Sequence, residues 1–293
     1  MADLQNLIGL EKPLEKLIET VGEGFGVVGN AVFKFDAKRI KRIGEAQAEA
    51  EKTKIIKKAE GEADAIVVLN RASKRFALEQ YNRQINLENI VVKSKEYLER
   101  NVSDQPVDKD WTARFLSVAQ EVSREEIQEL LAKILAGEVS KPNTYSLRAL
   151  EVIRNLSRNE LEGFKKFIAL STPNGYFHIH GANREPLLKY GLHFGDFVHL
   201  ADIGLFNPST MLSLSIEVKS LHPAYLAAAS HVFLMTSETD KSVNLGILKF
   251  TDAGMQIYEL LLSESSNPNR EAYINDFTEH LKSQGIDVNK GKK

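Results

Sequence analysis

Residues 37–100 constrain the fold more than any other part of the chain, because they contain no proline and only two glycines, Gly44 and Gly61. Charged side chains alternate there with an apolar stripe, a pattern that predicts one long helix or two helices in line. At 1.5 Å per residue, an unbroken helix of this length would span roughly 95 Å. Such an element builds no core of its own, so we expect a partner surface, above all a second copy of the chain. The pattern leaves open whether the helix bends back near Gly61.

Composition limits the classes of protein to which this chain can belong. A chain of 293 residues with 43% hydrophobic residues can form about two domains with cores of their own. The net charge of −2 gives no overall attraction to nucleic acid. The absence of cysteine excludes disulfides, thiol catalysis and thiolate metal sites. With no signal peptide and no apolar window of about 18 residues, we expect a cytoplasmic protein, or one peripheral at the inner membrane.

The first segment, residues 1–36, predicts an amphipathic helix with a strip of small residues. Its apolar face follows helical spacing through Leu14, Leu17, Ile18, Val21, Phe25, Val28 and Val32. Gly22, Gly26 and Gly29 lie on an adjacent strip, where each glycine costs up to about 1 kcal/mol relative to alanine. The strip either allows another helix backbone to approach closely or breaks the helix near residue 24.

A basic cluster follows this helix directly. It consists of Lys34, Lys38, Arg39, Lys41 and Arg42. An apolar face followed by cations is the arrangement that holds a helix on an anionic bilayer. With Phe25 and Val28, these residues are the candidate membrane contacts, and the alternative is a solvated helix face.

Two further parts complete the organisation. Residues 102–171 predict a helical module, with Trp111 as a core residue and capping boxes at Ser123–Glu126 and Ser157–Glu160. Residues 172–293 predict an α+β domain with strands at 176–180, 213–218, 231–236 and 244–250, the last two joined as a hairpin. The helix at 194–204 and a helix capped by Thr251 give this domain a winged-helix-like order. The predicted fold class is α+β, mostly α, in four parts: 1–36, 37–101, 102–171 and 172–293.

A resemblance to a known family rests on the helical module. The motifs that carry it are WTARF at 111–115, VSREEIQEL at 122–130, AKILAGEV at 132–139, Pro142 and SLRALEVIRNLS at 146–157. They resemble an uncharacterised bacterial family, domain of unknown function 2806, and more distantly the abortive-infection alpha proteins of antiphage defence. Leu131 stands where a tryptophan is usual in the family, which is a packing change. The resemblance implies a bacterial cytoplasmic protein with a role in phage defence, and it supplies no catalytic residues.

Motifs for chemistry are weak throughout the sequence. Gly24 to Gly29 spell G-x-G-x-x-G, but a helical pattern precedes them and a lysine-rich one follows, unlike a dinucleotide-binding unit. His178 and His180 share one strand face without a third ligand at metal-site spacing. We therefore expect no enzyme, no cofactor and no metal.

Together these patterns predict a non-enzymatic homo-oligomer, an effector or scaffold whose N-terminal helix contacts partner subunits or the membrane surface, and the resemblance implies that it is of the abortive-infection type. A phage or host protein would be the trigger. The alternative is a regulator that binds nucleic acid or protein through the winged-helix-like domain. Nucleic acid is the weaker partner, because residues 194–204 contain Asp196 and Asp202 and no lysine or arginine.

Overall fold

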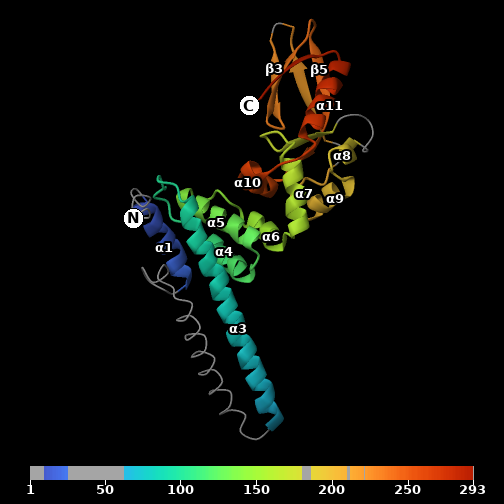
Figure 1. The fold of residues 1–293 in the computed structure, drawn as a ribbon. Helices are drawn as coiled ribbons and strands as arrows, with labels where there is room; N and C mark the ends of the chain where they lie inside the picture. Colours follow the sequence, from blue (N-terminus) through green and yellow to red (C-terminus); the bar gives the residue numbers. More distant parts are fainter. Residues whose placement is uncertain (1–9, 26–62, 180–185, 210–211, 221, 293) are drawn as a thin grey trace. The chain divides into compact units, whose positions relative to one another are not determined.

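The computed structural model describes residues 10–25, 63–179, 186–209, 212–220 and 222–292 (Figure 1). The chain divides into two units, unit 1 up to Arg154 and unit 2 from Asn155. The predicted boundary near residue 171 differs from this division. The difference arises because α7 (Arg158–Ile168) packs with α9 and α10 of unit 2. The predicted class, α+β and mostly α, is confirmed.

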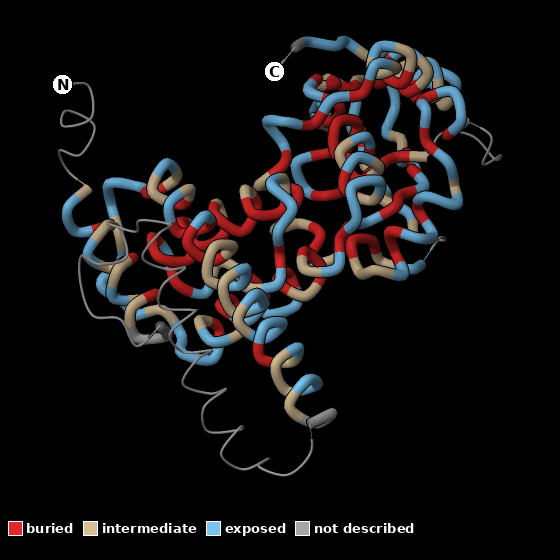
Figure 2. The backbone as a smooth tube through the Cα atoms, turned by 60° about the horizontal axis from the view of Figure 1, so that its bottom comes forward, coloured by how far each residue is buried: buried red, intermediate tan, exposed pale blue. Residues whose placement is uncertain are grey.

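Unit 1 is helical and is built around one central helix. Among its described residues, the helices are α1 (Glu11–Phe25), α3 (Ala63–Ser94), η3 (Lys95–Tyr97), α4 (Lys109–Glu121), α5 (Glu125–Ser140) and α6 (Leu147–Asn155). The central helix α5 contacts α1, α3 and η3, and Figure 2 shows how much of this region is buried. Leu131 of α5 is fully buried, which places the family's tryptophan position inside the core. Trp111 is also a core residue, as predicted. Its ring stacks on that of Phe115.

A buried carboxylate fixes the connection from α5 to α6. Glu138 accepts hydrogen bonds from the backbone N–H groups of Asn143, Thr144 and Tyr145 at 2.6 to 3.1 Å. Asn143 adopts a φ of 69°, in the left-handed region that asparagine tolerates better than most residues. Burial raises the pKa of Glu138, and the three backbone donors oppose that shift.

Unit 2 contains two small antiparallel sheets. Its elements after α7 are β1 (Tyr176–Ile179), α8 (Pro186–Lys189), α9 (Phe194–Asp202), β2 (Leu212–Val218), β3 (Ala224–Ala228), β4 (His231–Thr236), β5 (Lys241–Lys249), α10 (Asp252–Leu261), η4 (Leu262–Glu264), α11 (Arg270–Ser283) and β6 (Asp287–Lys292). The first sheet has the order β1-β5-β2, and the second has the order β3-β4-β6. The winged-helix-like order that the sequence predicts is a helix at 194–204, a strand, a hairpin and a helix capped by Thr251. The helix α9, the strand β2 and the helix α10 follow in that order, but the hairpin does not form.

The predicted hairpin between 231–236 and 244–250 is wrong. Both segments are strands, but β4 pairs with β3 and β6, whereas β5 pairs with β1 and β2. The tight turn lies instead between β3 and β4, where Ala229 and Ser230 both have positive φ. Such turns usually contain asparagine or glycine, so the Ala-Ser pair gives no recognisable turn signal.

An aromatic cluster forms the core beside the first sheet. Phe164 and Phe167 of α7 pack on Phe206, with ring centroids 5.8 and 5.2 Å apart. The ring centroid of Phe206 lies 4.7 Å from that of Phe250, the residue that follows β5. This packing explains why α7 belongs to unit 2.

Helix starts agree with the predictions at two of three positions. Ser157 and Glu160 form the predicted capping box of α7, and Thr251 caps α10 by accepting from the Gly254 N–H. The capping box predicted at Ser123 is wrong, because the N-cap residue of α5 is Arg124 and makes no side-chain cap hydrogen bond.

A glycine in α10 provides a test of the core of unit 2. A Cβ added at Gly254 would overlap the Leu205 carbonyl oxygen, which backbone hydrogen bonds hold in place. Gly254→Ala should lower the free energy of unfolding by about 1–3 kcal/mol. Gly163→Ala is the matched control, because no atom lies within 4 Å of the new methyl group. It should be neutral or stabilise by up to about 1 kcal/mol. Urea denaturation followed by circular dichroism measures both, and equal shifts would contradict the packing described.

Candidate functional site

The residues predicted from sequence as sites fall mostly outside the described part of the chain. Gly22 lies in α1, and Phe25 is the last residue of that helix. The others lie beyond the described ranges, and their contacts remain predictions: Gly26, Val28, Gly29, Lys34, Lys38, Arg39, Lys41 and Arg42.

The described part of the N-terminal apolar face is used inside unit 1. Leu17 and Val21 are buried, and α1 contacts α4 and α5. Burying a side chain of this size contributes about 1.5–3 kcal/mol, so separating these two from the unit costs roughly 3–6 kcal/mol. This face can reach a membrane only after α1 leaves α4 and α5.

A groove of about 810 Å³ lies between α1, residues 103–107 and α4. Lys12 Nζ lies 2.5 Å from Asp104 Oδ1, and Lys16 Nζ donates to the Ser103 carbonyl oxygen at 2.8 Å. Burial lowers the pKa of Lys16. Oxygen atoms of the same chain already bind both lysine ammonium groups. The groove therefore gives no indication of the charge that a ligand would carry.

The C-terminal third of α3 is attached to unit 1 by apolar burial. Leu87, Ile90 and Val91 are almost fully buried, and α3 packs against α4 and α5. Ser94 ends the helix on the same side and is also buried. The attachment therefore uses one side of the helix only.

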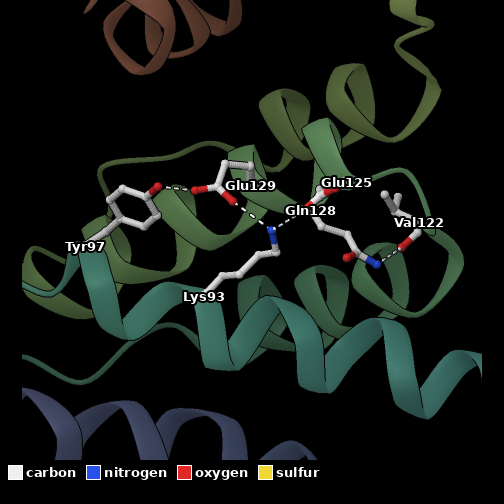
Figure 3. Close-up of polar contacts among 6 residues, drawn as sticks. All are labelled: Lys93, Tyr97, Val122, Glu125, Gln128 and Glu129. Carbon is white, nitrogen blue, oxygen red and sulfur yellow. Dashed lines mark hydrogen bonds and ion pairs between the residues drawn. The ribbon is translucent and has the colours of Figure 1, made fainter. Parts of the chain in front are cut away.

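A polar cluster reinforces this attachment (Figure 3). Lys93 Nζ donates to Glu129 Oε2 at 3.0 Å and to Glu125 Oε1 at 3.2 Å. The Tyr97 hydroxyl donates to the other carboxylate oxygen of Glu129. Lys133 lies over the Tyr97 ring, 5.4 Å from its centroid. We call these five residues the α3–α5 clamp.

The clamp perturbs the pKa values of its two central residues. Burial alone would raise the pKa of Glu129, but hydrogen bonds from Tyr97 and Lys93 outweigh it and hold that pKa below its usual value. The hydrogen bond to Glu129 raises the pKa of Lys93. Both residues are therefore ionised at neutral pH, and the clamp includes a charge-assisted hydrogen bond.

A buried amide connects α3 to α4 and α5 beside the clamp. Gln128 donates through Nε2 to the Val122 carbonyl oxygen at 2.9 Å and to Asn86 Oδ1 at 3.3 Å. Asn86 in turn donates to the Gln120 carbonyl oxygen at 3.0 Å. Neither the clamp nor this network was predicted from sequence, because their members lie some 30 to 40 positions apart. The only available sequence signal was that Gln128 and Glu129 lie three and four positions after Glu125 on α5, which places their polar groups on one side of that helix.

The opposite side of α3 faces solvent. Its members are spaced three or four positions apart: Val67, Arg71, Lys74, Leu78, Asn82, Ile85, Asn89 and Val92. All are exposed except Ile85, which is partly buried, and Val67 and Leu78 are 54% and 60% exposed. We call this surface the outer face of α3. Four of the ten large hydrophobic side chains that are exposed in the described residues lie in the first half of α3: Val67, Val68, Phe76 and Leu78.

The described residues offer little for metal chemistry or for crossing a membrane. They contain no group of three potential metal ligands. His178 is buried and stacks on Phe277 at 5.3 Å, with a pKa lowered to about 4 by that burial, and His180 lies outside the described residues. Within the same ranges, every helix is too short or too polar to traverse a bilayer.

The helix α9 of unit 2 precedes strand β2 of the first sheet. It carries Asp196 and Asp202 and no lysine or arginine. His199 Nε2 lies 2.6 Å from Glu160 Oε1, which connects α9 to the capping box of α7. The surface of α9 is therefore acidic, the opposite of what a phosphate backbone requires.

These features define a protein that combines a helical unit carrying an exposed helix face with an α+β unit of two small antiparallel sheets. The chain belongs to the family described as "Protein of unknown function (DUF2806)", whose model matches residues 70–277. This range begins within α3 and extends into α11. No curated protein and no solved structure matched the chain.

The two glutamates of the clamp should contribute unequally to the free energy of unfolding. Glu129→Ala should lower the free energy of unfolding by about 1–3 kcal/mol, because it removes the acceptor shared by Tyr97 and Lys93. Glu125→Ala is the matched control on the same helix. Its side chain is 84% exposed, against 31% for Glu129, so its effect should stay within about 0.5 kcal/mol. Chemical denaturation measures both.

The effect of Glu129→Ala should also depend on pH. The pKa of Glu129 is lower in the folded than in the unfolded state, so its contribution is complete above the unfolded value of about 4.5. It is lost as the pH falls through the folded value. The difference between wild type and variant should thus be full at pH 7 and shrink below about pH 4.5. A difference that grows in acid would contradict the assignment.

Proposed function

We propose that this protein is not an enzyme and acts by association with itself. The observation that supports the proposal is the outer face of α3, where apolar side chains meet solvent along a helix whose C-terminal third is attached on its other side. Covering water-exposed valine and leucine side chains with a partner lowers the free energy of the complex. A helix with one face attached to its own unit is a rigid platform for such a partner.

We also propose the role in antiphage defence that the abortive-infection resemblance implies. Unit 2 would sense a phage or host protein, and the N-terminal segment would then act on partner subunits or on the inner surface of the membrane. The acidic helix α9 supports recognition of a protein in this picture. Phage challenge of bacteria that express the chain, against bacteria that do not, tests the defence role.

The second candidate is a regulator that works through unit 2. The winged-helix-like order expected from the sequence favours it, since that fold often serves recognition. The acidic α9 supports a protein ligand over a nucleic acid. A gel shift at low salt separates the two, because binding to phosphate would be strongest there.

Self-association should appear directly in the molar mass of the protein. Light scattering coupled to size exclusion should give a multiple of 32.8 kDa, and the mass should rise with concentration if the association is weak. A mass of one chain at every concentration, up to the solubility limit, would contradict the proposed function.

Contact with the membrane should depend on the basic cluster. Changing Lys38, Arg39, Lys41 and Arg42 to glutamine removes about 4 kcal/mol of attraction to an anionic surface, or roughly a thousandfold in partitioning. Flotation with vesicles containing phosphatidylserine measures this loss. The matched control changes four exposed lysines elsewhere: Lys141, Lys166, Lys249 and Lys282. Membrane contact is disproved if the wild type stays in the soluble fraction under all triggers, or if both sets of changes act equally.

A further inference from the structure

The outer face of α3 is continuous over most of the helix. It extends from Val67 to Val92, about 38 Å at 1.5 Å per residue. Its last three apolar members, Leu78, Ile85 and Val92, are spaced seven residues apart, the spacing at which two helices keep one seam in contact. A partner of the same length and spacing would cover the whole face.

The charges on this face are unevenly distributed. Arg71 and Lys74 both lie in its first half, whereas its second half contains only the uncharged Asn82 and Asn89 between the apolar residues. Glu96 is exposed one turn beyond Val92. A parallel copy in register would bring four cations together, and like charges facing each other are destabilising.

We propose that the outer face binds the same face of a second copy of the chain in antiparallel orientation. The inference rests on the proposed self-association and names its surface and direction. The two helices cross near residues 81 and 82, so Leu78 packs against the partner's Ile85. Arg71 lies beside the partner's Val92 and within reach of the partner's Glu96. Each basic half thus meets the uncharged half of the other helix.

Orientation can be read from chemical cross-links, because the chain has no cysteine of its own. Arg71→Cys and Val92→Cys are made separately, and both positions are exposed, so neither change disturbs the core. The two proteins are mixed, allowed to exchange subunits and treated with a short bismaleimide. Each variant has one cysteine, and in an antiparallel pair of like variants the two cysteines lie about 31 Å apart along the helices, beyond the reach of the reagent.

The antiparallel pair predicts a dimer cross-link between the two variants in the mixture and little cross-linking of either variant alone. Self-cross-linking of each variant would show a parallel pair and overturn the inference. If light scattering shows association but the mixture gives no cross-link, the surface is wrong and the proposed self-association stands. A monomer at all concentrations overturns both.

A substitution on the seam provides the second measurement. Leu78→Glu should weaken association at least about tenfold, because it places a charge at the centre of the contact. Val198→Glu is the matched control, since Val198 is an exposed valine of α9 in unit 2. Circular dichroism confirms that both variants are folded. Equal weakening by the two changes, or none by Leu78→Glu, would overturn the assignment of the outer face.

Discussion

The attachment of α3 to α5 is the interaction on which the rest of unit 1 depends. Leu87, Ile90 and Val91 supply the apolar contact, and the α3–α5 clamp adds hydrogen bonds that fix the helix in register. Because the buried residues and the clamp lie on one side, the other side of the same helix is left in water. One element thereby serves as a wall of the core and carries the surface proposed for a partner.

The N-terminal helix faces a different constraint. Its buried residues, Leu17 and Val21, already contribute to the packing of α1 on α4 and α5. The proposed membrane contact by that face would therefore compete with folding, and the cost of several kcal/mol would make release conditional on a trigger. The outer face of α3 carries no such cost, which is why we propose it as the site for association at rest.

Local sequence signals predicted local structure well. The capping box at Ser157, the cap at Thr251 and the core position of Trp111 each depend on residues a few positions apart or on one large apolar side chain. Pairing of strands was predicted less well. The strands β4 and β5 are adjacent in sequence but join different sheets. The turn that forms instead is Ala229-Ser230, between β3 and β4, and its residues give no typical turn signal.

Periodicity and composition alone determined that the chain is mostly helical, that a long charged helix precedes an α+β part, and that cysteine chemistry is absent. Helical periodicity reveals an apolar side but not what covers it. Only the tertiary structure decided that the side holding Leu87, Ile90 and Ser94 is covered by α4 and α5, and that the side holding Leu78 is not. That distinction depends on contacts between residues 30 or more positions apart, which no local pattern encodes.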